Sequence, residues 1–327
     1  MNREPSNQIA GGCIEFESSE ELGKPLRRYF SLEVSQLQPG SFTGSLSFLC
    51  SGAALLYRQD YPRPVHITGE VLGGRFGVGI RLGMGTAIFA GETVDERHLP
   101  SAMTGEEIEF TGLGGYRQMV LAVDQARLLR MAEAERVAPR VLRGLSPGRN
   151  GMALSVHPRW GACVAETFGK LLDEADAGLI RASPENFEDL IYESILSVVE
   201  HSDLPCGRTP AAVVVRRAID WADSSPGRLP RIHGLAAGLR MSPRTLQKAF
   251  FSVTGMGPNA FFRTRLLNRA RHVLLRSDPG GTKVCAIARD LGFTELGRFS
   301  VRYRELFGES PSQTLLRRPR PIVLVPG

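Results

Sequence analysis

Two stretches of the chain share one layout: residues 231–255 read RIHGLAAGLRMSPRTLQKAFFSVTG, and residues 282–308 read TKVCAIARDLGFTELGRFSVRYRELFG. Each begins with a short helical segment that holds an Ala-Ala or Ile-Ala pair, passes through a tight turn, and continues as a longer amphipathic helix that ends at glycine. This order is typical of a helix-turn-helix unit, whose second helix enters the major groove of DNA. Two such units on one chain can read two successive major-groove faces of one DNA site.

The longer helix of the first unit has a well-marked start. Ser242 precedes Pro243, and a serine cap followed by proline at the first helical position favours initiation there. Helical spacing places four apolar residues on one face, which we predict to be buried: Leu246, Ala249, Phe250 and Val253. The opposite face carries side chains that hydrogen-bond base edges and phosphates. The DNA contacts predicted for this unit are those of Ser242, Arg244, Thr245, Gln247 and Lys248.

The second unit is chemically poorer. Its predicted buried face consists of Phe299, Tyr303, Leu306 and Phe307. The DNA contacts predicted for it are those of Leu296, Gly297, Arg298, Ser300, Val301 and Arg302. Only Arg298 and Ser300 are obvious polar base readers near the start of the helix, whereas the apolar members can contact thymine methyl groups. We therefore expect this unit to contribute weaker or more shape-dependent specificity.

A predicted helix of 19 residues, Pro258–Arg276, joins the two units. At about 1.5 Å per residue it spans roughly 28 Å, near the ~34 Å that separates successive major-groove faces on one side of DNA. A rigid connector of this length can hold both reading helices near that spacing. Further helices of the C-terminal part are expected at 210–224, 233–239, 243–253, 282–291, 294–307 and 311–316.

The N-terminal half has a different pattern. Between Tyr29 and Val123, short apolar alternations are broken by Gly and Pro, which predicts strands of an antiparallel sandwich or small barrel. Residues 1–28 are expected to be loosely ordered apart from a strand at Cys13–Phe16, and helices are expected at 124–137, 160–177 and 184–201. The apolar face of the last helix can either close this core or pair with a second subunit. A Pro- and Gly-rich loop that includes SPGRNG, from Ser146, is expected after the first of these helices, and a linker at 202–210.

The fold class predicted from these patterns is α+β multidomain. Residues 1–205 are expected to form a β-rich, barrel or cupin-like sensor or dimerisation domain, and residues 206–327 an all-α double helix-turn-helix domain. Charge follows the same division: residues 206–327 carry 21 Lys and Arg against 7 Asp and Glu, and residues 1–205 carry 19 against 27. A basic block of this size is the footprint expected for contact with the phosphate backbone.

Composition argues against several other classes of protein. No apolar run approaches the ~20 residues that a membrane span needs, and the N-terminal MNREPSNQ lacks the layout of a signal peptide. The five cysteines are scattered and odd in number, which favours reduced thiols and a cytoplasmic location. No membrane partner is expected.

The sequence carries no clear signature of a catalytic, cofactor or metal site. The glycine-rich GGRFGVGIRLGMG, from Gly73, lacks the Lys-Ser/Thr of a P-loop, and we expect hairpin glycines there. The histidines form no ligand spacing, although a barrel could bring His66 and His98 together on facing strands. No catalytic arrangement can be argued from the spacings, so the sequence predicts no enzyme, no cofactor and no metal.

The C-terminal sequence resembles the DNA-binding domain of the AraC/XylS family of bacterial transcription regulators over about residues 210–317. The most specific matches are Ile287-Ala288, Leu291-Gly292-Phe293, Phe299-Ser300, Leu306-Phe307-Gly308 and Ser310-Pro311. The first unit adds Leu235-Ala236, Met241-Ser242, Leu246, Phe250 and Thr254-Gly255, and the connector adds Arg265-Leu266, Ala270-Arg271 and Leu274-Leu275. The chain departs from the family at Val301, a position that is often arginine, which weakens the expected share of the second unit in base reading.

This resemblance implies a seven-helix domain that binds asymmetric double-stranded DNA sites, with base contacts from Arg244, Gln247 and Lys248. In the second unit it implies base contacts from Leu296, Gly297 and Arg298, with Val301 as a further candidate. It implies a transcription regulator, more often an activator, whose other arginines contact phosphates. RNA polymerase, a small-molecule effector and a second copy of the chain are the further partners implied. The candidates for an effector pocket are apolar and aromatic strand residues such as Phe48, Tyr57 and Phe89.

Two alternatives stay open from the sequence. In one, the N-terminal domain serves only for dimerisation. In the other, it is a cupin-like metalloenzyme fused to a DNA-binding tail.

Overall fold

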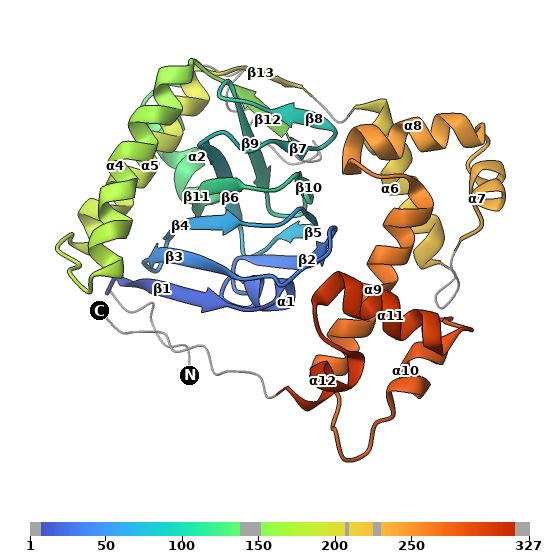
Figure 1. Ribbon diagram of the computed structural model, residues 1–327. Helices are drawn as coiled ribbons and strands as arrows, with labels where there is room; N and C mark the ends of the chain where they lie inside the picture. The colour runs from blue at the N-terminus through green and yellow to red at the C-terminus, as the bar shows by residue number, and fades with distance from the viewer. Residues whose placement is uncertain (1–7, 138–151, 207–208, 225–229, 318–327) are drawn as a thin grey trace.

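The computed structural model describes residues 8–137, 152–206, 209–224 and 230–317. Figure 1 shows a β-rich region built from the N-terminal half beside a helical region built from the C-terminal part. The predicted fold class is confirmed. The predicted loop from Ser146 falls largely outside the described residues.

The β-rich region consists of two antiparallel sheets. The first has the strand order β1-β3-β4-β11-β6-β9-β12-β13, and the second β2-β5-β10-β7-β8. The first sheet comprises β1 (Ala10–Phe16), β3 (Gly44–Cys50), β4 (Ala54–Tyr61), β11 (Tyr116–Asp124), β6 (Arg75–Leu82), β9 (His98–Met103), β12 (Met152–Ser155) and β13 (Asp203–Cys206). The second comprises β2 (Phe30–Gln36), β5 (Val65–Val71), β10 (Glu107–Gly112), β7 (Ala87–Phe89) and β8 (Glu92–Val94).

Both faces of the larger sheet are buried, because its strands supply apolar side chains to two cores. In β4, Leu55 and Tyr57 face the second sheet, and Leu56 lies in the other core. That other core lies under α2 (Gln125–Ala134), α4 (Pro158–Asp176) and α5 (Pro184–His201). Alternate residues of a strand point to opposite faces, so a strand covered on both sides reads as a nearly continuous apolar run.

Helix α5 settles one of the open alternatives. Its apolar side chains are buried within the chain, among them Phe187, Ile191 and Ile195. Its Ser183 side chain accepts the amide of Asn186, and Pro184 occupies the first turn, as predicted. The apolar face therefore closes the core.

The expectation of loose order before residue 28 is wrong for residues 8–28. Strand β1 pairs with β3 along its whole length, and helix α1 (Ser19–Leu22) follows it. Leu22 and Leu26 are fully buried between the sheets. These apolar residues are spaced too irregularly to give a helical or strand period, which is why the pattern failed to predict them.

The predicted linker at 202–210 is also partly wrong. Residues 203–206 form β13, which pairs with β12 at the edge of the larger sheet. Edge positions tolerate proline because the outer amide needs no partner, and this strand contains Pro205. Proline within the segment made it look like a linker in the sequence.

The helical region matches its predicted helices to within two residues at every end. It comprises α6 (Pro210–Asp223), α7 (Ile232–Gly238), α8 (Pro243–Thr254), α9 (Pro258–Arg276), α10 (Val284–Asp290), α11 (Leu296–Phe307) and α12 (Pro311–Leu316). These helices enclose two separate cores, one in each helix-turn-helix unit. Within the described ranges, no helix is long and apolar enough to cross a membrane.

The two regions meet along β2 and α9, which lie side by side (Figure 1). The Gln36 amide N–H donates to Asn268 Oδ1 at 2.9 Å, and Asn268 Nδ2 donates back to the Gln36 carbonyl at 3.0 Å. The Gln36 side chain also donates to the Leu306 carbonyl at 3.0 Å, near the end of α11. One residue of the β-rich region thus holds both the connector helix and the second unit.

Candidate nucleic-acid interface and interior cavity

The first unit is built around a sharp turn between α7 and α8. Arg240 adopts a positive φ of 55° there, and the Met241 amide donates to the Ala236 carbonyl at 2.9 Å. Ser242 Oγ accepts the Thr245 amide at 3.1 Å, which caps α8. At the other end, Gly255 takes a left-handed φ of 69°, where glycine has no Cβ penalty. These signals fix both ends of α8.

The two faces of α8 divide as predicted. All four predicted apolar residues are buried: Leu246, Ala249, Phe250 and Val253. All four polar residues of the opposite face are exposed: Arg244, Thr245, Gln247 and Lys248. Ser242 is exposed as well, but its hydroxyl is engaged with Thr245, whose Oγ1 lies 2.8 Å away. The structure therefore brings the predicted contact residues together on one solvent-facing surface.

We expect Ser242→Ala to lower the free energy of unfolding of the first unit by about 1 kcal/mol, because the amide of Thr245 loses its acceptor. Ser252→Ala, on the same helix, should cost little or nothing, since Ser252 is exposed and its hydroxyl only donates to the Ala249 carbonyl. Urea unfolding followed by Trp221 fluorescence, in a Trp160→Phe background, measures both changes. Equal effects of the two substitutions would contradict the capping role of Ser242.

The second unit starts less firmly. Helix α11 begins after Glu295, which makes no side-chain cap, and it ends at Gly308 with a φ of 74°. Its predicted core residues are buried: Phe299, Tyr303, Leu306 and Phe307. Of its predicted contact residues, Gly297, Arg298, Ser300 and Val301 are exposed, and Leu296 and Arg302 are partly buried. Leu296 packs against the core of this unit, which leaves less of it free for a base.

Two polar side chains of α11 already have partners within the chain. Arg298 Nη1 donates to Glu295 at 3.0 Å, and both side chains are well exposed. Such a surface pair is worth roughly 0–1 kcal/mol, so a guanine or phosphate can displace the carboxylate. Ser300 Oγ donates to the Leu296 carbonyl at 3.1 Å, which keeps its lone pairs available as acceptors.

The sequence did not single out Arg263, which lies on α9 beside Arg302 of the second unit. Burial and the neighbouring Arg302 lower the pKa of Arg263. Among the residues that the structure describes, its Nε has no hydrogen-bond partner. Two adjacent guanidinium groups favour an anion between them, and a phosphate oxygen of DNA suits that position. Only the fold brings these two arginines together, so no local sequence signal could have found the pair.

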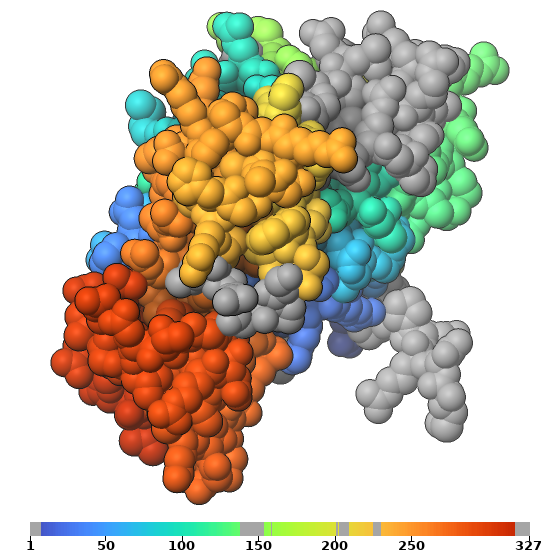
Figure 2. Space-filling view, turned by 90° about the vertical axis from the view of Figure 1, so that its right-hand side faces the viewer, coloured from blue at the N-terminus to red at the C-terminus, as the bar shows by residue number. Residues whose placement is uncertain are grey.

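Two other arginines of α9, Arg265 and Arg271, are not available to phosphates. Arg265 pairs with Asp223 at 2.7 Å, and Arg271 is almost fully buried between Glu20, at 3.2 Å, and Glu309, at 2.7 Å. The expectation that the remaining arginines contact DNA is therefore wrong for Arg271. Figure 2 shows the helical region as two lobes on one face of the molecule, with α6–α8 in the upper lobe and α10–α12 in the lower.

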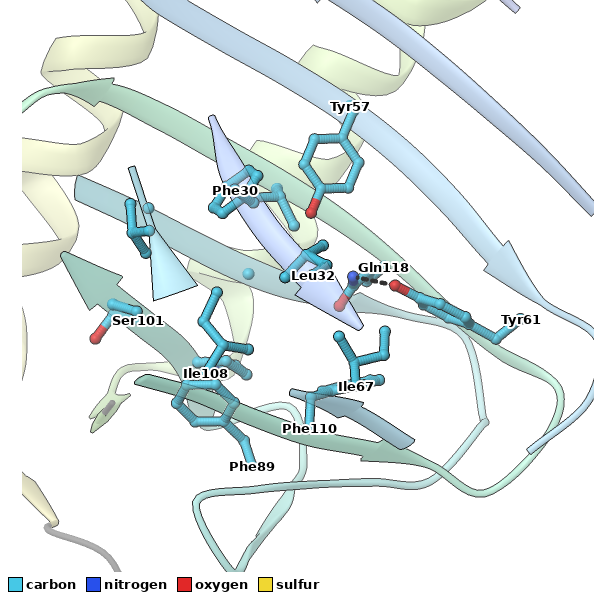
Figure 3. Close-up of a pocket in the computed structure, with 16 residues that line it drawn as sticks. Phe30, Leu32, Tyr57, Tyr61, Ile67, Phe89, Ser101, Ile108, Phe110 and Gln118 are labelled. Carbon is cyan, nitrogen blue, oxygen red and sulfur yellow. Dashed lines mark hydrogen bonds between the residues drawn. The ribbon is translucent and has the colours of Figure 1, made fainter. Parts of the chain in front are cut away.

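A cavity of about 70 Å³ lies between the two sheets of the β-rich region. Figure 3 shows that aromatic and aliphatic side chains surround it, with Gln118 and Tyr61 as a polar pair at one side. Gln118 Nε2 donates to Tyr61 Oη at 2.7 Å, and Tyr61 Oη donates to Gln59 at 2.6 Å. Of the three effector-pocket candidates, Tyr57 and Phe89 line this cavity, while Phe48 is buried nearby without lining it.

The histidines named as a conceivable metal pair take different partners. His66 Nδ1 lies 3.0 Å from Thr111 Oγ1, and its ring meets the edge of Phe261 of α9. Burial, with smaller effects from Arg265 and Arg216, lowers the pKa of His66 to about 3. His98 Nδ1 instead lies 2.7 Å from Asp95. The described residues contain no group of three or more side chains that could hold a metal ion.

The glycine-rich stretch from Gly73 behaves as predicted. Gly73 and Gly74 form a turn with φ values of 68° and 70° before β6, and Gly83, with a φ of 79°, follows that strand. Left-handed backbone of this kind is what glycine supplies in tight turns.

Comparison with known proteins agrees with the geometry of the helical region. Residues 235–317 match the family model described as a helix-turn-helix domain. The probable thc operon regulatory protein of Rhodococcus erythropolis is 29% identical over 167 residues, which cover 51% of this chain and 44% of that protein. The XylDLEGF operon transcriptional activator 2 of Pseudomonas putida is 30% identical over 131 residues, covering 40% of this chain and 83% of the activator.

A solved structure of a probable AraC family transcriptional regulator from Rhodopseudomonas palustris is 38% identical in sequence to the matching part of this chain. The match covers 33% of this chain and 99% of the other, with a TM-score of 0.29. The chain spans less than half the length of the Rhodococcus relative, but most of the length of the Pseudomonas putida activator 2. The similarity to that activator, together with the helix-turn-helix match, identifies the chain: it belongs to the AraC/XylS family of transcription regulators.

Proposed function

We propose that the chain binds a specific double-stranded DNA site near a promoter and activates transcription there in response to a small molecule. The single observation that supports this best is the polar face of α8, where Arg244, Gln247 and Lys248 stand exposed above a fully buried apolar face. A helix with one anchored face and one reading face is what major-groove recognition requires. In this proposal α11 reads the adjacent groove face through Arg298, Ser300 and their neighbours.

In this proposal, sensing and DNA binding belong to separate parts of the chain, which meet near residue 206. Residues 1–205 form the sensor or dimerisation part, and residues 206–327 the DNA-binding part. Activation is proposed because the Pseudomonas relative is named as a transcriptional activator. RNA polymerase and a second copy of the chain are the protein partners proposed, and the site of action is the cytoplasm, with the DNA.

We propose that the effector binds in the cavity between the two sheets. Its lining is mostly aromatic and aliphatic, with Gln118 and Tyr61 offering hydrogen bonds. Such a lining suits a mainly apolar molecule with one or two polar groups, and at about 70 Å³ the cavity has to widen to admit one. The family offers no support for the alternative of a metalloenzyme fused to a DNA-binding tail, and we do not propose it.

The proposal is tested by the effect of Arg244→Ala and Gln247→Ala on binding to the site that the chain selects from fragmented genomic DNA. Each substitution is expected to cost about 1–3 kcal/mol and to relax specificity at one or two base pairs, because a base loses its bidentate partner. Arg181→Ala removes an exposed arginine from the β-rich region and serves as the matched control. Fluorescence anisotropy at fixed salt measures all three.

Two outcomes would contradict base recognition by α8. If affinity and base preference survive both substitutions on α8, that helix is not the reading helix. If Arg181→Ala weakens binding as much as Arg244→Ala, net charge rather than base recognition dominates.

A further inference from the structure

A second cavity, of about 490 Å³, lies where α1 and β2 face α9. It differs in character from the cavity between the sheets, since charged and polar side chains line it alongside Phe30, Leu32, Val34 and Leu72. From the β-rich region come Ser19, Lys24, Arg27 and Ser31, and from α9 come Arg269, His272 and Arg276. Figure 1 shows that these elements belong to the two regions whose contact fixes the connector helix. We call this space the interregion cleft.

Positive charge converges on the cleft from both sides. No ion pair engages Lys24, Arg27 or Arg276 within the part of the chain that the structure describes. Burial lowers the pKa of His272, and Arg276 and Lys24 add to this effect, while Glu33 opposes it. Like charges held this near one another repel, which an anion between them would relieve.

The two acidic side chains of the cleft, Glu20 and Glu33, offset this positive charge only in part, because each is shared with an arginine of α9. Glu20 is committed to the buried pair with Arg271, at 3.2 Å. Glu33 lies 3.6 Å from Arg265. Arg269 of the cleft does have a partner, Asp223 at 3.3 Å. Both side chains are exposed, so this ion pair contributes little to stability.

A buried hydroxyl adds a second, independent observation. Ser19 is 1% exposed and lines the cleft. Its Oγ has no hydrogen-bond partner among the described residues. A buried polar group without a partner costs free energy, so this hydroxyl is suited to a ligand atom. This unpartnered hydroxyl therefore belongs to the lining of the space on which the positive charges converge.

We propose that the interregion cleft binds a small phosphorylated molecule. A phosphate group carries about −1.5 to −2 charges at neutral pH and strong acceptor oxygens, which Lys24, Arg276 and the Ser19 hydroxyl match. The volume falls within the ~300–1,000 Å³ typical of small-molecule sites, and so leaves room for the organic part. The ligand bridges α1 and α9, and thereby ties the β-rich region to the helix between the two DNA-reading units. This inference does not depend on the effector assigned to the cavity between the sheets.

The test uses the full-length chain without DNA, with pyrophosphate and AMP as phosphate probes and succinate as a carboxylate probe at equal ionic strength. Isothermal titration calorimetry is expected to give millimolar or tighter binding of both phosphate probes. Arg276→Gln and Lys24→Gln should each weaken this binding at least tenfold. Ser19→Ala should weaken it several-fold without any change of charge.

Arg181→Gln is the matched control, because it removes an exposed arginine elsewhere in the β-rich region. It should leave binding unchanged. Thermal unfolding without a probe checks that each variant folds like the original chain, which the partial or full exposure of Lys24 and Arg276 favours. If the phosphate probes do not bind, if succinate binds equally well, or if Arg181→Gln weakens binding as much as Arg276→Gln, the phosphate site is refuted.

Discussion

Arg271→Met is expected to destabilise the chain by about 3–5 kcal/mol, the typical cost of removing one partner from a buried ion pair. The Arg271 side chain is 4% exposed and contacts Glu20 at 3.2 Å and Glu309 at 2.7 Å. Its guanidinium carbon also lies over the ring of Phe307, 4.7 Å from the ring centroid. Without it, Glu20 remains buried with no compensating charge. Urea unfolding at pH 7 measures the loss.

The pH dependence of the same variant is a sharper signature. Burial raises the pKa of Glu20 even when Arg271 is present, and removal of that cation raises it further. A folded-state pKa above the unfolded value means that the unfolded chain releases the proton first as pH rises, so stability falls with increasing pH. Acidification from pH 7 toward the pKa of an ordinary glutamate should therefore restore part of the lost stability.

Two further variants make the test decisive. Arg269→Met removes an exposed partner of Asp223 from the same helix and should cost at most about 1 kcal/mol. The double variant Glu20→Gln with Arg271→Met removes the buried charge and should recover part of the stability at pH 7. Should Arg271→Met prove no more harmful than Arg269→Met, the buried pair is not what holds α1 against α9.

Phe250→Ala and Phe299→Ala are the second pair of large expected effects. Each ring is almost fully buried, at 0% and 2% exposure, in the core of its own helix-turn-helix unit. Truncation of a buried phenylalanine typically costs about 3–5 kcal/mol. Because the two cores share no residue, Phe250→Ala should loosen α8 and spare α11, while Phe299→Ala does the reverse.

Footprinting on the selected DNA site distinguishes the two variants. Loss of protection over one half of the site with Phe250→Ala, and over the other half with Phe299→Ala, is the expected result. Phe251→Ala provides the control, since Phe251 lies on the same helix as Phe250 but is 59% exposed. Identical footprints for both core variants would mean that the units do not read separate halves.

The helical region was predictable because its helix ends carry local signals. Pro258 marks the start of α9 and Gly255 the end of α8, and both were placed to within one residue. Buried faces followed from spacing alone, as with Leu246 and Phe250. Such signals lie within a few residues of the feature that they determine.

Strands and interregion contacts were harder for a physical reason. Strand β9 contains Pro100, and β12 and β13 are four residues each, too short to show alternation. The Gln36–Asn268 pair joins residues 232 positions apart, and nothing near either residue announces the other. The burial of Arg271 could not be predicted for the same reason. A basic residue in a basic segment suggests a DNA contact, and only the fold brings Glu20 next to Arg271.

Gln36 has a consequence for how the DNA site can change. Its backbone and side chain form hydrogen bonds with α9 and with the last turn of α11. The orientation of the two reading helices relative to each other therefore depends on a residue of the β-rich region. A promoter whose half-elements are shifted by one base pair is rotated by about a tenth of a helical turn. A chain that adapts to such a promoter would have to change the contacts of Gln36. The spacing between half-elements that it recognises could therefore change without any change in the residues that select bases.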